Sequence, residues 1–117
     1  MPSELLTKRL KFTRLLCDLI QWGNQQPGWT IALGRDYDEA NESTRHMRGC
    51  LQYLGLANDL ALYINGEYQT TTEAYKSLGE RWEQMDPDCK WGGRFRNAKG
   101  NPRPDGNHFS VAFQGKA

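Results

Sequence analysis

The first part of the chain alternates between apolar and polar residues with the period of a helix. Residues 3 to about 22 carry apolar side chains three and four positions apart, with charged residues between them. This pattern predicts an amphipathic helix. Ser3 can cap its start, and Gly23 and Asn24, followed by Pro27, can end it. The apolar positions are Leu5, Leu6, Phe12, Leu15, Leu16, Leu19 and Ile20.

The middle of the chain shows strand patterns instead. "WTIAL" (29–33) is a short apolar run, and "LGLANDLALYI" (54–64) is a longer one that ends in Asn65-Gly66. Asn-Gly between two such runs is a strong hairpin signal. The sequence therefore predicts that "EYQT" (67–70) returns as the partner strand.

A second helix is predicted over residues 70–85, "TTTEAYKSLGERWEQM". Thr70 and Glu73 have the spacing of a capping box. One face of this helix carries apolar residues, which are Tyr75, Leu78, Trp82 and Met85.

The last part of the chain predicts two short strands, 90–95 ("KWGGRF") and 108–113 ("HFSVAF"), and a loop between them. The polar stretch 34–50 is predicted to be a long loop. Helices beside strands joined by hairpins indicate an α+β fold, a small antiparallel sheet with packed helices. The expected core residues are Leu54, Leu56, Leu60, Leu62, Trp82 and Phe109.

Size and charge restrict the class of protein. The chain has 117 residues, which predicts one domain spanning residues 1–117. It has 15 basic and 14 acidic residues, so no excess of charge points to nucleic acid or a membrane as a partner. The basic cluster of Arg94, Arg96, Lys99 and Arg103 is read as a positively charged loop.

Cysteine usage and hydropathy indicate the compartment. The three cysteines, Cys17, Cys50 and Cys89, form no CxxC pair, so reduced thiols are expected. No apolar run resembles a signal peptide or a membrane span. These features predict a cytoplasmic protein.

The candidate chemistry lies at Asp59, Asp105 and His108. Asp59 interrupts an apolar strand, where an unpaired carboxylate is costly. His108 begins the last strand, and Asp105 precedes it by three residues. Asp59 and His108 could bind zinc, with Asp105 as the base that takes a proton from water. Alternatively, Asp59 bonds to backbone amides and "DGN" is an ordinary turn.

Several segments in order carry a resemblance to a known family. "GLANDLALYINGEYQTTTEAYKSLGERWE", then "WGGRF", then "DGNHFS" resemble the DD-carboxypeptidase-like zinc peptidases of bacteria and phages. That family includes VanY and VanX relatives and phage L-alanyl-D-glutamate endolysins, and the resemblance covers residues 29–113. It implies a DD-peptidase-like fold, and zinc-dependent cleavage of a peptide bond in peptidoglycan. Without a signal peptide, the cell wall would have to be reached by a separate route.

The resemblance also implies roles for individual residues. Asp59 and His108 match two zinc ligands, and Asp105 matches the catalytic acid. Seven residues before Asp59, where the family has a third ligand, a histidine, this chain has Gln52, and His46 lies six residues earlier. Gln52 or His46 could complete the site, and so could the soft ligand Cys50.

A second departure concerns the groove for the substrate. Where the family usually has Tyr-Arg after its first strand, this chain has Tyr37 followed by Asp38, with Arg35 nearby. An aspartate there does not stabilise an oxyanion. The residues expected to line the groove are Arg35, Tyr37, Asp38, Trp91 and Arg94. Gly92 and Gly93 are expected to allow close approach of the backbone near the site, or simply to form a turn.

Three hypotheses follow from these observations. The chain is a phage-type peptidoglycan peptidase with an altered metal site that acts on a stem peptide. Alternatively, it has lost catalysis, and its groove binds a small molecule or a host protein, with Trp29, Tyr37, Tyr53 and Trp91 as candidate contacts. In the third, it is a structural protein that uses only the fold.

Overall fold

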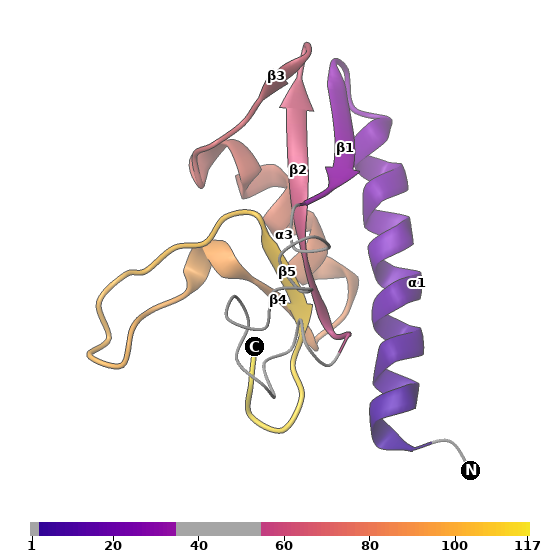
Figure 1. The fold of residues 1–117 in the computed structure, drawn as a ribbon, viewed down its shortest axis with the longest axis vertical. Helices are drawn as coiled ribbons and strands as arrows, with labels where there is room; N and C mark the ends of the chain where they lie inside the picture. The colour runs from indigo at the N-terminus through magenta and orange to yellow at the C-terminus, as the bar shows by residue number, and fades with distance from the viewer. Residues whose placement is uncertain (1–2, 35–54) are drawn as a thin grey trace.

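The computed structural model describes residues 3–34 and 55–117, and this part of the chain has an α+β fold (Figure 1). Two helices pack on a five-stranded sheet whose strands pair antiparallel throughout. The elements are α1 (Glu4–Asn24), β1 (Trp29–Leu33), β2 (Ala57–Ile64), β3 (Glu67–Tyr68), η1 (Glu73–Tyr75), α3 (Lys76–Met85), β4 (Cys89–Trp91), η2 (Gly92–Arg94) and β5 (His108–Val111).

Strand β2 is the centre of the sheet. The strand order is β1-β2-β5-β4, and β3 also pairs with β2. The C-terminal part of β2 pairs with β1 from Leu60 to Ile64, and its N-terminal part pairs with β5 from Ala57 to Asp59. The predicted hairpin at Asn65 is confirmed, because β3 follows at once and Asn65 has a φ of 51°.

The first helix agrees with its prediction and runs slightly further, to Asn24. The Oγ atom of Ser3 accepts a hydrogen bond from the backbone N–H of Leu6 at 3.0 Å, so the predicted N-cap is confirmed. The helix lies along one side of the sheet (Figure 1) and buries Phe12, Leu15, Leu16 and Leu19.

The second helix begins later than predicted. A 3₁₀ turn, η1, precedes α3, so the regular helix starts at Lys76 and not at residue 70. The predicted capping box at Thr70 is wrong, because Thr71 provides the oxygen atom that accepts the N–H of Ala74, at 3.2 Å. The predicted buried face is confirmed for Tyr75, Leu78 and Trp82.

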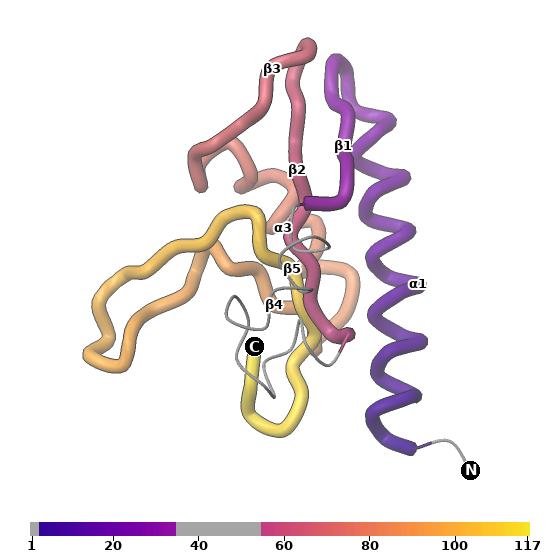
Figure 2. The backbone as a smooth tube through the Cα atoms, in the orientation of Figure 1, coloured from indigo at the N-terminus to yellow at the C-terminus, as the bar shows by residue number. Residues whose placement is uncertain are grey.

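The two late strands are shorter than predicted. β4 ends at Trp91, and the backbone then turns through η2. β5 ends at Val111, two residues before the predicted end. Between η2 and β5 the backbone extends away from the sheet and comes back beside the start of β5 (Figure 2). One bridge, Arg96 with Pro102, joins the two sides of this excursion.

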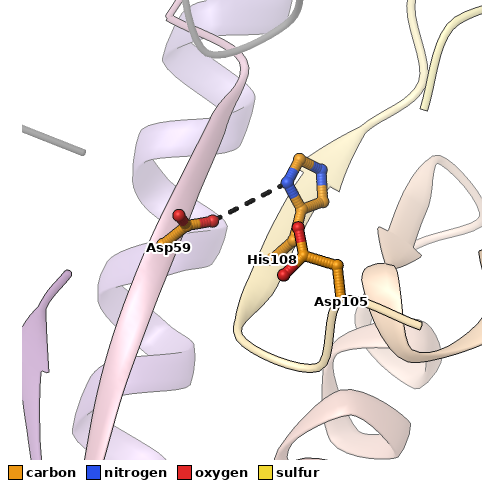
Figure 3. A group of neighbouring side chains, drawn as sticks. All are labelled: Asp59, Asp105 and His108. Carbon is orange, nitrogen blue, oxygen red and sulfur yellow. Dashed lines mark ion pairs between the residues drawn. The ribbon is translucent and has the colours of Figure 1, made fainter. Parts of the chain in front are cut away.

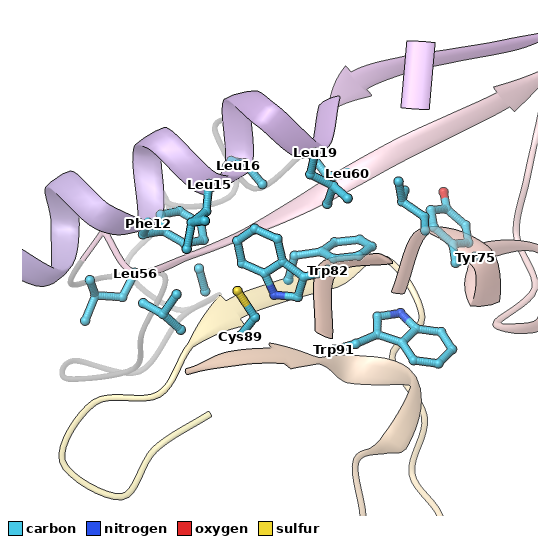
Figure 4. Packing of buried hydrophobic residues seen from close by; sticks show 14 of the residues in the cluster. Phe12, Leu15, Leu16, Leu19, Leu56, Leu60, Tyr75, Trp82, Cys89 and Trp91 are labelled. Carbon is cyan, nitrogen blue, oxygen red and sulfur yellow. The ribbon is translucent and has the colours of Figure 1, made fainter. Parts of the chain in front are cut away.

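The core lies between the helices and the sheet, and Trp82 is at its centre (Figure 4). Its ring makes edge contacts with Phe12 from α1 and Phe109 from β5, at centroid distances of 5.9 and 6.2 Å. Its Nε1–H donates to the carbonyl oxygen atoms of Lys90 and Ser110, at 3.1 and 3.0 Å. Trp82 therefore joins α1, α3, β4 and β5 in one packing unit.

The other expected core residues follow the same arrangement. Leu56, Leu60, Leu62 and Phe109 are fully buried, as predicted, whereas Leu54 lies outside the described residues. Cys89 is also buried, and burial raises the pKa of its thiol to about 12. Cys17 and Cys89 are free thiols among the described residues, and the predicted reduced state of the protein stays a prediction.

No helix in residues 3–34 or 55–117 combines the length and the apolar character that crossing a bilayer requires.

An ionic cluster attaches α1 to the turn before β4. The Nζ atom of Lys11 lies 2.8 Å from Asp86 and 3.1 Å from Asp88, and Lys8 also bonds to Asp88. The hydrogen bond from Lys11 is the main cause that lowers the pKa of Asp86, and the bond from Lys8 has the same effect on the pKa of Asp88. The contacts stabilise the folded state only while both carboxyl groups are ionised.

Replacing Trp82 tests its place in the core. We expect Trp82→Phe to lower the free energy of unfolding by about 2–4 kcal/mol, because the backbone carbonyl groups of Lys90 and Ser110 lose a hydrogen-bond donor and a cavity forms. Urea unfolding followed by circular dichroism measures the change. Trp29→Phe, at a half-buried position, is the control and should cost less than about 1 kcal/mol. Equal losses in the two variants would contradict the central role of Trp82.

The ionic cluster predicts a loss of stability in acid. Both aspartates have a lower pKa in the folded state, so their contribution is complete above the unfolded pKa near 3.8 and disappears as the pH falls through the folded pKa. We expect the Lys11→Met variant to show a shallower fall in unfolding free energy between about pH 5 and about pH 2. Urea unfolding at a series of pH values measures this slope. Arg14→Met, which removes an exposed cation of α1, should leave the slope unchanged.

Candidate metal centre

The pairing of β2 with β5 brings Asp59 and His108 together. These two residues are direct partners in the antiparallel register, so their side chains lie on the same face of the sheet. The Nδ1 atom of His108 lies 3.8 Å from the Oδ1 atom of Asp59 (Figure 3). Only 11% of the His108 side chain and 19% of the Asp59 side chain are exposed. The contact is therefore largely shielded from water.

Asp105 reaches the same place from a turn. The N–H of His108 donates to the carbonyl oxygen atom of Asp105 at 3.1 Å, which closes a four-residue turn. Asp105 is exposed, and its carboxylate lies beside the His108 ring (Figure 3). Each of the three residues offers one ligand atom, and these atoms lie within 4.8 Å of one another. The sequence prediction that Asp59, Asp105 and His108 converge is confirmed.

The donor atoms of this group suit a zinc ion. Imidazole nitrogen and carboxylate oxygen are common zinc ligands, at about 2.0–2.2 Å from the metal. Two ligands of a tetrahedral ion are then roughly 3.3 Å apart. The observed distance of 3.8 Å between the Nδ1 atom of His108 and the Oδ1 atom of Asp59 is close to that spacing. A small shift of either side chain would bring the two atoms to the distance expected of zinc ligands.

Trp91 and Gly92 hold the turn that carries Asp105. The indole Nε1–H of Trp91 donates to the carbonyl oxygen atom of Gly106 at 2.7 Å. The N–H of Asp105 donates to the carbonyl oxygen atom of Gly92 at 2.8 Å. A Cβ atom on Gly92 would lie 2.1 Å from the Asp105 carbonyl oxygen atom, so this approach requires glycine. The prediction of close backbone contact is confirmed at Gly92.

Trp91 supports the site and is not an exposed groove residue. Only 5% of it is exposed, and its ring packs so closely against Gly79 and Gly93 that a Cβ atom on either would lie within 2.3 Å of it. The sequence pattern placed Trp91 among the expected groove residues, and its hydrogen bond to Gly106 was not predicted. A glycine in the middle of a helix, Gly79, was the available signal, because it often marks close packing.

Two further contacts hold His108 and Asp59 in place. The ring of Phe95 packs against the His108 ring, with centroids 5.0 Å apart and planes tilted by 57°. On the other side, the N–H of Gly34 donates to the carbonyl oxygen atom of Asp59 at 2.7 Å. A Cβ atom on Gly34 would lie 2.9 Å from the Cβ atom of Asp59. Gly34 therefore lies directly against Asp59 without covering it with a side chain.

Two pockets adjoin the candidate centre, and Tyr68 and Asn107 line both. The first, which we call the threonine pocket, has a volume of about 220 Å³ and is also lined by Thr70, Thr71, Thr72 and Asp105. The second, the tyrosine pocket, has a volume of about 360 Å³ and is also lined by Leu33, Gly34, Asp59 and Tyr63. Each pocket is therefore lined by one of the two carboxylates of the centre.

Arg94 does not contribute to either of these two pockets. Its guanidinium group bonds to Glu83 at 2.6 Å and lies over the Trp91 ring. The bond to Glu83 is the main cause that raises the pKa of Arg94. Arg94 lines a separate pocket of about 410 Å³ with Phe95 and Arg96. Its predicted contact with a substrate stays a prediction.

Five other predicted site residues lie outside the described part of the chain. They are Arg35, Tyr37, Asp38, His46 and Gln52. Their predicted roles, and that of Cys50, stay predictions.

Comparisons with protein-family models, with curated proteins and with solved structures find no match to this chain. The resemblance to the DD-carboxypeptidase-like peptidases remains a hypothesis that rests on the sequence motifs.

Substituting Gly92 tests how tightly the turn is held. We expect Gly92→Ala to lower the free energy of unfolding by more than about 2 kcal/mol, because the new methyl group collides with the backbone of Asp105. Thermal and urea unfolding measure the loss. Gly66→Ala is the matched control, since no atom lies within 4 Å of its Cβ position and only its φ of 84° resists alanine, at about 1 kcal/mol. A Gly92→Ala variant as stable as the control would contradict the close contact.

Proposed function

We propose that this chain is a zinc-dependent peptidase that hydrolyses peptide bonds in peptidoglycan, as its resemblance to the DD-carboxypeptidase-like family implies. The convergence of Asp59, Asp105 and His108 beside two pockets supports this proposal. Asp59 is distant in sequence from Asp105 and His108, and these two match the spacing of an acid three positions before a histidine.

The three side chains differ in exposure to solvent, and this difference suggests a different role for Asp105 than for Asp59 and His108. Asp59 and His108 are shielded and face each other, which is the environment expected of metal ligands. Asp105 is exposed and borders the threonine pocket, which is the environment expected of a group that exchanges protons with substrate and water. Zinc bound by Asp59 and His108 would supply a Lewis acid for the peptide carbonyl group.

The remaining steps belong to Asp105. Its carboxylate can accept a proton from the water molecule that adds to the carbonyl carbon atom of the substrate. When the C–N bond breaks, Asp105 can return that proton to the leaving nitrogen atom. The products are a carboxylic acid and an amine, and water is the only other reactant.

A second candidate function has one observation in its favour. The Nδ1 atom of His108 and the Oδ1 atom of Asp59, 3.8 Å apart, would attract each other as an ion pair without a metal if the histidine is protonated. A groove without metal would then bind a small molecule or a host protein, and Gln52 in place of a histidine is consistent with such a loss of catalysis.

The zinc content of the purified protein separates the two functions. We expect about one zinc ion per chain after dialysis, measured by elemental analysis, and much less in Asp59→Ala and His108→Ala. The Asp105→Asn variant should keep its zinc and lose hydrolysis of purified peptidoglycan by about 10²-fold to 10⁴-fold. Asp18→Ala, on the exposed face of α1, is the control and should change neither quantity.

Three more variants address the remaining ligand. Gln52, His46 and Cys50 are its predicted sources, so Gln52→Ala, His46→Ala and Cys50→Ala distinguish them. The variant that loses zinc identifies the ligand. A folded wild-type protein without zinc would contradict the peptidase proposal and favour the binding function.

A further inference from the structure

The segment that leads from η2 to the turn of Asp105 carries only positive charge. Residues 93–104, which we call the basic loop, contain four cationic side chains and no aspartate or glutamate. The whole chain has 15 basic and 14 acidic residues, so this local excess does not follow from the composition. The four cationic residues, all at exposed positions, are Arg94, Arg96, Lys99 and Arg103.

Hydrogen bonds order the basic loop, although most of it adds nothing to the core. The N–H of Arg103 donates to the carbonyl oxygen atom of Phe95 at 2.8 Å. The N–H of Asn97 donates to the carbonyl oxygen atom of Asn101 at 2.9 Å, and the Oδ1 atom of Asn97 accepts the N–H of Asn101 at 3.0 Å. No residue from 96 to 104 is buried, and the loop extends away from the sheet (Figure 2). The loop therefore presents its cations to solvent on an ordered backbone.

Three of the four cations have no acidic partner. Arg94 is paired with Glu83 at 2.6 Å. None of the ion pairs in the described part of the chain includes Arg96, Lys99 or Arg103. Because like charges repel one another, these side chains would gain electrostatic energy from an anionic partner.

The basic loop also contains a pocket of about 410 Å³, which we call the basic pocket. Its lining residues, none of them acidic, are Gly93, Arg94, Phe95, Arg96 and Pro102. Arg96 donates one N–H to the carbonyl oxygen atom of Gly100 at 2.9 Å, so its guanidinium group has further N–H donors for a ligand. A planar guanidinium group can bind a phosphate group through two parallel hydrogen bonds. A phosphate group therefore suits this pocket.

The other side chains of the loop favour one kind of phosphate ligand. Single-stranded nucleic acids stack their bases on aromatic rings, but the one aromatic ring of the loop, Phe95, packs against His108. A wide double helix would bring its phosphates towards Glu80 and Glu83, which flank Arg94. A membrane contact usually includes apolar side chains that enter the bilayer. The large apolar side chains that are exposed in the described residues all lie outside the loop, and they are Leu6, Leu10, Leu33 and Tyr68.

We propose that the basic loop binds a flexible phosphodiester polymer without bases, with one phosphate group in the basic pocket and others beside Lys99 and Arg103. The inference goes beyond the proposed function and does not rest on it, because it requires neither zinc nor hydrolysis. The loop continues directly into the turn of Asp105, so a bound polymer would lie close to the candidate centre.

Binding to poly(glycerol phosphate) at a series of salt concentrations tests the inference. Fluorescence anisotropy of the labelled polymer measures the affinity. We expect the wild type to bind, and the double variant Lys99→Gln, Arg103→Gln to bind about tenfold more weakly. The slope of log affinity against log salt concentration should become shallower by about 1.4, because each phosphate contact of a single-stranded polyanion contributes about 0.7. Neither side chain takes part in the hydrogen bonds that order the loop, so the variant should keep its conformation.

A second double variant is the matched control. Arg14→Gln with Lys76→Gln also removes one arginine and one lysine from exposed positions, but on α1 and α3. We expect its affinity to stay within about twofold of the wild type. Equal losses in the two double variants would overturn the inference, because the attraction would then depend on net charge alone. A wild type that does not bind the polymer at low salt would overturn it as well.

A conservative variant tests the basic pocket. Arg96→Lys keeps the charge but lacks the planar fork, so we expect about fivefold weaker binding with an unchanged salt slope. An affinity equal to that of the wild type would overturn the placement of a phosphate group in this pocket.

Competing polyanions test the choice of partner. A single-stranded oligonucleotide with the same number of phosphate groups and vesicles of phosphatidylglycerol are the two probes. We expect both to bind more weakly than poly(glycerol phosphate). Tighter binding of either one would overturn the assignment to a polymer without bases.

Discussion

The pairing register of β2 with β5 is the constraint on which the site depends. It places Asp59 directly opposite His108, on the face of the sheet away from the helices. In a strand, a shift by one residue moves every side chain to the other face. Such a shift would bring Asp59 into the core and remove Leu60 and Leu62 from it. The same burial that stabilises the fold therefore fixes the two proposed ligands.

The core and the candidate site lie on opposite faces of one sheet. Trp82 stabilises the core, and Trp91 stabilises the turn that carries Asp105. Trp82 ties both helices to β4 and β5 through ring contacts and two hydrogen bonds. Trp91, at the end of β4, holds the turn that carries Asp105 by donating a hydrogen bond to the carbonyl oxygen atom of Gly106. Both indole groups bond to backbone carbonyl groups, so they set distances between backbone segments. A preorganised site requires such rigid support.

The proposed metal chemistry is consistent with the exposure of the three side chains. Asp59 and His108 are largely shielded, whereas Asp105 is exposed and borders the threonine pocket. Asp59 lines the tyrosine pocket, so a ligand in either pocket would lie beside one carboxylate of the centre. If Gln52 has ended catalysis, the same pockets would still be available to another ligand.

The sequence by itself determined the elements, because apolar periodicity and turn residues are local. It predicted α1, the hairpin at Asn65 and the buried face of α3, and the spacing of Asp105 and His108 already suggested one turn. It misplaced the start of α3. Whether Thr70 or Thr71 accepts the first free N–H group depends on the backbone path between β3 and η1, which the sequence pattern does not specify. The sequence suggested that Asp59 and His108 converge, but only the tertiary structure showed the strand register that pairs them and the hydrogen bond by which Trp91 holds the turn, because register and packing join residues that are distant along the chain.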